Sequence, residues 1–193
     1  MPERAQQIMD AAMKLADEGG FEAVRLRDVA AKAGVALGTL YARFSSKEDI
    51  LIAVLEQEAG KLEEIFEMYP AEFPTAEERA IYYFTVMTQA MYTRPNFAKA
   101  VLRAVAVGSE DTAAKIARYQ ANLTQLFVTA LRGDGTTETG VPVEREEEIA
   151  FLLQQIWFAA LVGWMAGIRR DEEVMEQMRS STALVLAGLR AGA

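Results

Sequence analysis

The stretch RLRDVAAKAGVALGTLYARFSSK, residues 25–47, constrains the fold of this chain more than any other. Its apolar residues fit two short helical stripes that meet at Gly34, and Leu40 and Phe44 carry the second stripe. Glycine tolerates the positive φ that a tight turn between helices requires. Two short helices joined by such a turn form a helix-turn-helix, whose second helix enters the major groove of DNA. The pattern predicts that this second helix runs from about Leu37 to Phe44.

The outer side of this second helix supplies the candidate DNA contacts. If its two apolar residues hold it to the core, the remaining side chains face outward. A tyrosine on that face is better explained by a hydroxyl contact to phosphate than by packing. A lysine at the start of the next helix is favoured near phosphate, because helix N-termini attract anions. Arg27, at the start of the first helix of the helix-turn-helix, is a further candidate for a phosphate or minor-groove contact. The candidate DNA-binding residues are Arg27, Leu37, Gly38, Thr39, Tyr41, Arg43 and Lys47.

The segments DVAAKAGVALGTLY and GTLYARFSSKEDIL closely resemble the DNA-binding segment of TetR-type transcriptional regulators. The resemblance covers roughly Arg4 to Leu55 in detail, and the helix order and length of the remaining chain fit it. It implies an all-α fold of about nine helices. A three-helix head with the helix-turn-helix, residues 1–47, would bind DNA, and residues 48–193 would form a larger body for ligand binding and dimerisation. The residues alone leave open a small helical hairpin with an incidental aromatic side chain.

Several helix boundaries are marked locally. Gly19 and Gly20 predict the end of the first helix. Either Ser45 with Glu48 or Ser46 with Asp49 makes a capping box for the fourth helix. Thr75 with Glu78 makes a second capping box, which predicts the start of the fifth helix.

Composition argues against an enzyme. The 193 residues include no cysteine and no histidine, which excludes thiol chemistry and removes the commonest general base and metal ligand. The acids near the start of the eighth helix, Glu144 and Glu146–Glu148, favour the helix dipole and point in different directions. We expect them to be solvated, and we expect neither a metal ion nor a cofactor.

The net charge of −8 is unevenly distributed along the chain. Residues 1–47 hold seven Lys or Arg and six Asp or Glu, whereas residues 48–193 hold thirteen and twenty-two. Only charge within a Debye length of about 8–10 Å acts strongly on phosphate, so an acidic body is compatible with a DNA-binding head.

One uncharged segment, Ile149–Ile168, is long enough to span a bilayer. The adjacent Gln154 and Gln155 argue against a span, and a helix that is apolar all round can instead be buried in protein. The N-terminal residues lack the apolar core of a secretory signal. We therefore expect no membrane association and a cytoplasmic location.

The apolar residues of the middle helices, many of them aromatic or methionine, fit either a packed core or an effector cavity. TetR-type proteins enclose a cavity between these helices, so the resemblance favours the second interpretation. A weaker resemblance of RPNFAKAVLRA and IWFAALVGW to actinobacterial repressors of steroid and lipid catabolism implies an apolar effector, such as a lipid, acyl-CoA or steroid-like molecule. A polyaromatic or drug-like ligand would suit a similar wall. The candidate ligand-binding residues are Phe66, Tyr83, Phe84, Met87, Met91, Arg103, Gln120, Phe127 and Trp157.

The last two helices predict a homodimer. Tryptophans offer a large area for burial, and small residues one turn apart let two backbones approach. TetR-type proteins dimerise through these helices, and packing within one chain is the alternative. The candidate interface residues are Trp157, Ala160, Leu161, Gly163, Trp164, Gly167, Met178 and Val185.

These expectations combine into one predicted function. The chain is expected to act as a homodimeric repressor that an apolar effector releases from palindromic operator DNA. The alternative is a TetR-fold protein that works as a small helical enzyme or a lipid carrier without binding DNA.

Overall fold

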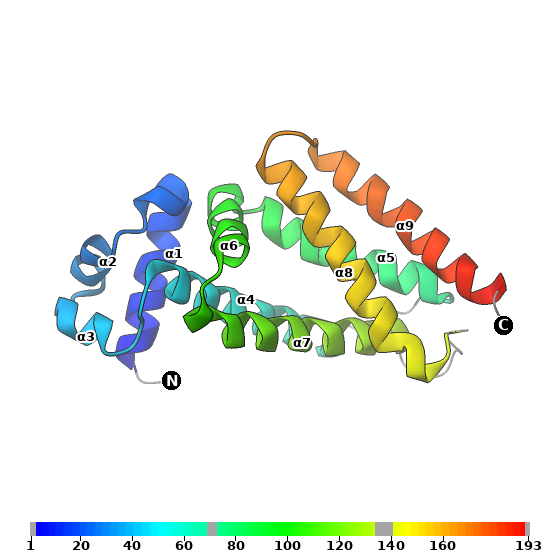
Figure 1. Ribbon diagram of the computed structural model, residues 1–193, viewed down its shortest axis with the longest axis horizontal. Helices are drawn as coiled ribbons and strands as arrows, with labels where there is room; N and C mark the ends of the chain where they lie inside the picture. Colours follow the sequence, from blue (N-terminus) through cyan, green and yellow to red (C-terminus); the bar gives the residue numbers. More distant parts are fainter. Residues whose placement is uncertain (1–2, 69–72, 134–140, 192–193) are drawn as a thin grey trace. The chain divides into compact units, whose positions relative to one another are not determined.

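The fold consists of helices whose ends are mostly marked in the sequence. The computed structural model describes residues 3–68, 73–133 and 141–191. Within these residues it contains nine α-helices (Figure 1), which confirms the expected all-α fold. They are α1 Glu3–Ala23, α2 Leu26–Ala33, α3 Leu37–Tyr41, α4 Lys47–Met68, α5 Ala76–Tyr92, α6 Pro95–Val107, α7 Glu110–Arg132, α8 Val143–Met165 and α9 Asp171–Ala191.

The helices form two compact units. Unit 1 comprises residues 1–60 and 91–119, and unit 2 comprises residues 61–90 and 120–193. The boundaries fall inside α4, α5 and α7, so each of these helices contributes residues to both units. The functional division at residue 47 remains a prediction.

Unit 1 contains the helix-turn-helix. The backbone of α1 is interrupted at Gly19 and Gly20, where the glycine pair predicted a stop, and Gly20 has φ of 67°. Helix α2 ends at Ala33, and the next residue, Gly34, has the left-handed backbone conformation with φ of 66°. This confirms the predicted turn. Helix α1 packs against α2 and, on another side, against α6 (Figure 1).

Helix α3 is shorter than the sequence predicted, because it ends at Tyr41 rather than Phe44. The chain continues in a turn in which the Phe44 N–H donates to the Leu40 carbonyl at 3.0 Å. This turn keeps Leu40 and Phe44 buried together, so their predicted role as anchors is confirmed.

Unit 2 contains α8 and α9, which run antiparallel beside each other (Figure 1). The Thr75 hydroxyl accepts a bond from the Glu78 N–H at 3.2 Å, and the Glu78 carboxylate accepts one from the Thr75 N–H at 3.1 Å. The predicted capping box of α5 is therefore confirmed. Among the described residues, α8 alone is long and apolar enough to cross a membrane, by length and composition. Its buried residues include Leu153, Trp157 and Leu161.

Candidate DNA-binding and ligand-binding sites

Helix α3 presents the side chains predicted to contact DNA. Leu40 and Phe44 are buried beneath it. Gly38, Tyr41 and Arg43 are exposed, and Leu37 and Thr39 are half-buried. The helix therefore has an anchored inner side and an accessible outer side, as a reading helix requires. Contact with DNA itself remains a prediction.

The basic candidates differ in how free their charges are. Arg27 and Arg43 are exposed, and neither has an ion-pair partner in the part of the chain that the structure describes. Lys47 is engaged within unit 1. Its ammonium group lies 3.8 Å from the centroid of the Phe21 ring and 3.7 Å from the Glu22 carboxylate. Phosphate would have to compete with these neighbours for Lys47.

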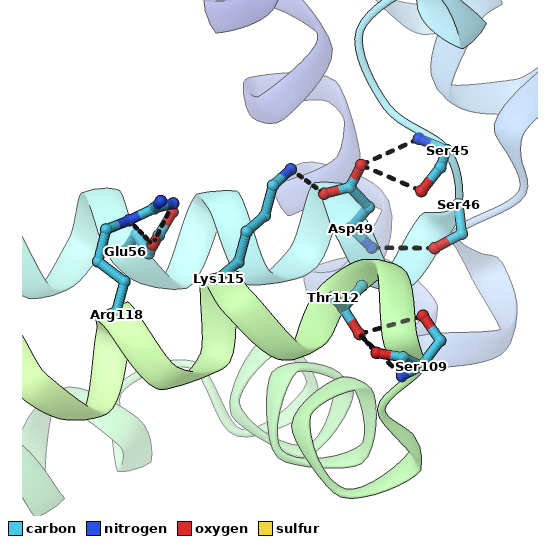
Figure 2. A network of polar contacts seen from close by, with 8 residues as sticks. All are labelled: Ser45, Ser46, Asp49, Glu56, Ser109, Thr112, Lys115 and Arg118. Atoms are coloured by element: carbon cyan, nitrogen blue, oxygen red, sulfur yellow. Dashed lines mark hydrogen bonds and ion pairs between the residues drawn. The ribbon is translucent and has the colours of Figure 1, made fainter.

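A buried carboxylate, Asp49, organises the start of α4 (Figure 2). It accepts hydrogen bonds from the Ser45 N–H at 2.9 Å and the Ser45 hydroxyl at 3.3 Å, and it pairs with Lys115 of α7. The Asp49 N–H donates to the Ser46 hydroxyl at 3.1 Å. Ser46 is therefore the cap, whereas the carboxylate reaches back to Ser45. Sequence reasoning found the cap, but it missed Lys115 because that residue is distant along the chain.

Helix α6 is attached to α1 at both of its ends. Near the first end, Arg94 Nε donates to Asp17 Oδ2 at 3.0 Å, and the Asn96 amide donates to the Asp17 carbonyl at 2.9 Å. Towards the other end, the Arg103 guanidinium lies 2.9 Å from the Glu22 carboxylate and 4.5 Å from the centroid of the Phe21 ring.

Arg103 was predicted to contact the ligand, and that role remains a prediction. The buried face of α6 carries Phe97, Val101 and Ala104. Arg103 lies off that face, is exposed, and makes its contacts with α1.

Five of the predicted ligand-binding residues form one aromatic cluster in unit 2. The aromatic cluster consists of Phe66, Tyr83, Phe84, Phe127 and Trp157, from four helices. All five are buried, and successive ring centroids lie 5.1–6.0 Å apart. The Trp157 indole N–H donates to the Thr88 hydroxyl at 2.9 Å. These distances are typical of favourable aromatic packing.

The remaining ligand candidates are placed less decisively. Met87 is fully buried in unit 2. Met91 is buried but belongs to unit 1, and Gln120 is half-buried at the start of the second segment of unit 2.

The predicted dimer residues mostly serve the core of a single chain. Trp157, Ala160, Leu161 and Met178 are buried within unit 2. Trp164 is also buried, and its indole N–H donates to the Asp171 carboxylate at 2.9 Å. A residue already covered by its own chain has little surface left for a partner, so these five are corrected to core residues.

The two predicted glycines also have local roles. The Arg169 side chain occupies the space beside Gly163, where an added Cβ would lie 3.1 Å from it. Gly167 has φ of 72° and follows the end of α8, where the Ile168 N–H donates to the Gly163 carbonyl at 2.9 Å. Val185 is half-buried. The largest exposed apolar side chains of α8 and α9 include Phe151, Leu152 and Leu184.

One of the acids predicted to be solvated is buried. Glu146 accepts hydrogen bonds from Arg132 Nη2 at 2.6 Å and Nε at 2.9 Å, so it joins α8 to the end of α7. The expectation of solvation was therefore wrong for Glu146. No group of three or more acids, histidines or cysteines suited to a metal ion occurs within residues 3–68, 73–133 and 141–191.

Two family models match most of the chain. Residues 8–54 match the model of bacterial regulatory proteins of the tetR family, and residues 74–185 match the model of the tetracyclin repressor-like C-terminal domain. The chain belongs to the TetR family. It is therefore a DNA-binding transcriptional regulator and not an enzyme.

Individual TetR-family proteins resemble the whole chain. The HTH-type transcriptional repressor KstR of Rhodococcus jostii (strain RHA1) is 30% identical over 184 residues, which cover 95% of this chain and 83% of the relative. A TetR transcriptional regulator from Rhodococcus sp. RHA1 superposes with a TM-score of 0.83 at 22% identity, covering 95% and 96% of the two chains. FadR of Bacillus subtilis, solved with stearoyl-CoA, gives a TM-score of 0.66 at 23% identity, covering 95% and 98%.

The matched N-terminal model contains α3, whose exposed side carries the predicted DNA contacts. The aromatic cluster lies in the part of the chain that matches the C-terminal model, apart from Phe66. The regulator thus has a DNA-binding segment in unit 1 and a separate aromatic core in unit 2.

Proposed function

We propose that this TetR-family regulator is a homodimeric repressor that an apolar effector releases from a palindromic operator. The observation that carries the proposal is α3, a helix anchored by Leu40 and Phe44 with Tyr41 and Arg43 exposed. Residues 1–47 form the DNA-binding part in this proposal, and residues 48–193 form the part that binds the effector and the second protomer. A regulator of bacterial genes works where the chromosome is, so we place it in the cytoplasm.

Each reading helix binds one half-site of the operator. Arg27 and Arg43 contact phosphate, since their charges are exposed and have no ion-pair partner among the described residues. Tyr41 donates its hydroxyl to phosphate. Leu37 and Gly38 have little hydrogen-bonding capacity, so they read thymine methyl groups and the shape of the groove.

The two protomers associate through α8 and α9. Exposed apolar side chains on these helices, among them Phe151 and Leu184, support this interface. A two-fold arrangement places the same surface on both protomers and sets the two reading helices about 34–36 Å apart, one turn of DNA.

The effector binds at the aromatic cluster and is largely apolar. Lipid, acyl-CoA and steroid-like molecules suit such a wall, and FadR of Bacillus subtilis was solved with stearoyl-CoA. A guest changes operator affinity only if it prefers one state of the dimer. Couplings of about 1–3 kcal/mol between two sites are typical, which corresponds to a change of roughly 5- to 150-fold in affinity.

A fluorescence titration tests the proposal. Labelled duplex DNA from the region upstream of the chain's own gene is titrated with the protein, and lauroyl-CoA, stearoyl-CoA and a steroid ketone are then added. We expect saturable, sequence-specific binding by a dimer and release by at least one of these molecules. The release part fails if none of them displaces DNA or raises the melting temperature. The operator part fails if upstream and scrambled DNA bind equally tightly at the same salt concentration.

A further inference from the structure

Unit 2 buries two uncharged polar atoms that have no hydrogen-bond partner among the described residues. They are the amide nitrogen of Gln154 on α8 and the hydroxyl of Thr182 on α9, whose residues are 6% and 0% exposed. Gln154 lies eleven residues before Met165, where α8 ends, and Thr182 lies eleven residues after Asp171, where α9 begins. In an antiparallel helix pair, equal distances from the connection bring two residues to the same level. Both unpaired atoms therefore occur at one level of the α8–α9 pair.

Gln154 borders the aromatic cluster. It stands one helical turn from Trp157 on α8, and its contact Thr124 stands one turn from Phe127 on α7. Residues three apart on a helix share a face. The Phe84 ring contacts both Trp157 and Phe127, with centroids 6.0 and 5.4 Å away. The amide thus lies beside the rings proposed to receive the effector.

The Gln154 amide cannot be fully paired by its neighbour. The Thr124 hydroxyl lies 3.3 Å from Gln154 Oε1 and 3.0 Å from the Gln120 carbonyl oxygen. Its single hydrogen serves one acceptor, and the shorter contact to the carbonyl is the better bond. If the amide turns its nitrogen towards the hydroxyl, its oxygen loses its partner instead. In either orientation one end of the amide has no hydrogen-bond partner among the described residues.

We propose that Gln154, supported by Thr182, binds a neutral oxygen of the effector, either a carbonyl or a hydroxyl. This inference rests on the proposed function and specifies the chemistry of its ligand. Gln154, Thr182, Thr124 and Thr88 are all uncharged, so a carboxylate placed among them would be buried without a cation. A neutral oxygen needs only one hydrogen bond to be satisfied there. Met87, which is buried and has a flexible side chain, is able to adjust to the guest.

The buried cation of unit 2 is directed elsewhere. Arg79 Nε donates to the Leu131 carbonyl at 2.7 Å, and Nη1 donates to the Phe73 carbonyl at 2.6 Å. Leu131 lies seven residues beyond Thr124 on α7, which is about 10 Å along the helix. Two of the three guanidinium nitrogens of Arg79 therefore bind carbonyls away from Gln154, whereas its Nη2 is buried without a hydrogen-bond partner among the described residues.

The first experiment compares two ligands that differ only in the carbonyl. Lauroyl-CoA is a thioester, and S-dodecyl-CoA is the thioether with the same chain and the same coenzyme. We expect the wild type to bind the thioester roughly 3- to 30-fold more tightly, the range expected for one buried hydrogen bond and the release of an unpaired group. Gln154→Leu should reduce this ratio to about one by weakening thioester binding. Gln155→Leu, the same substitution on the neighbouring residue, should keep the ratio.

The second measurement separates ligand binding from a structural role. Leucine has a similar size to glutamine and removes an unpaired buried amide, so the urea midpoint of Gln154→Leu should equal or exceed that of the wild type. A glutamine that serves only the fold would give a lower midpoint and an unchanged ligand ratio. Either of these two results would overturn the inference.

The outcomes also distinguish this inference from the proposed function. If both CoA compounds release the operator equally well, the inference fails and the repressor model stands. If the wild type binds neither compound nor the steroid ketone, the inference and the effector model fail together, whereas operator binding is judged separately. If the protein binds no operator but keeps the thioester preference, the proposed function fails and the inference stands.

Discussion

Lys115→Met should destabilise the protein, because it removes the cation beside the buried Asp49 carboxylate. The Asp49 side chain is 7% exposed and the Lys115 side chain 31% exposed. Loss of one partner from a fully buried ion pair costs about 3–5 kcal/mol, whereas exposed pairs contribute about 0–1 kcal/mol. Asp49 retains its two hydrogen bonds from Ser45, so we expect a loss of about 1–3 kcal/mol in the free energy of unfolding. For a chain of this size that corresponds to a decrease of about 2–12 °C in melting temperature.

A neighbouring ion pair provides the matched control for this prediction. Arg118 and Glu56 join the same two helices at 2.9 Å, but their side chains are 58% and 22% exposed (Figure 2). Arg118→Met should therefore cost less than about 1 kcal/mol. Urea denaturation followed by circular dichroism measures the free energy of unfolding of both variants. An unchanged slope of this free energy against urea concentration shows that the unfolding transitions are comparable. Equal losses for the two variants would refute the argument that burial of Asp49 sets the magnitude.

Three further predictions concern DNA, assembly and the effector. Arg43→Met should lower the slope of log K against log salt by roughly one unit, and Lys47→Met should lower it less because an acid of α1 shares that charge; equal slopes would contradict this ranking. Leu184→Glu should give folded monomers by light scattering, whereas Trp164→Glu should unfold because its site is buried; a folded, dimeric Leu184→Glu protein would argue against the α8–α9 interface. Met87→Trp should overpack the core, which lowers the free energy of unfolding by about 1–3 kcal/mol. It should also reduce the release of operator DNA by lauroyl-CoA while operator affinity persists. Undiminished release would place the effector elsewhere.

Local patterns predicted much of the fold. The turn at Gly34, the interruption at Gly19 and Gly20 and the capping box at Thr75 each depend on residues within a few positions of one another. The end of α3 was harder to place, because the turn after Tyr41 keeps a helix-like hydrogen bond and buries Phe44. The spacing of apolar residues predicts which residues are buried. Here both a continued helix and the observed turn bury Leu40 and Phe44, so the spacing does not distinguish them.

The dimer surface could not be located by the same reasoning. Helix α8 is apolar nearly all round, so its sequence does not separate the side packed in its own chain from the side left for a partner. Trp157 and Phe151 are comparable large aromatic residues, yet the first is buried and the second is 52% exposed. Only the neighbouring helices decide between them. The preference for tryptophan as an interface residue therefore selected the core.

In the DNA-binding head, residues 1–47, a count of charges along the sequence omits ion pairs with distant residues. Residues 1–47 carry nearly balanced charges, but two acids of α1 are paired with arginines from outside this range. Asp17 pairs with Arg94, which immediately precedes α6, and Glu22 pairs with Arg103 of α6. Because these partners lie far outside residues 1–47, they could not be predicted from the local sequence. Arg94 and Arg103 thus offset acids that would otherwise repel phosphate. Meanwhile five cations of the head have no ion-pair partner among the described residues, namely Arg4, Lys14, Arg25, Arg27 and Arg43. A chain with a net charge of −8 can therefore carry a head whose acids are partly neutralised, because folding places Arg94 and Arg103 against acids of α1.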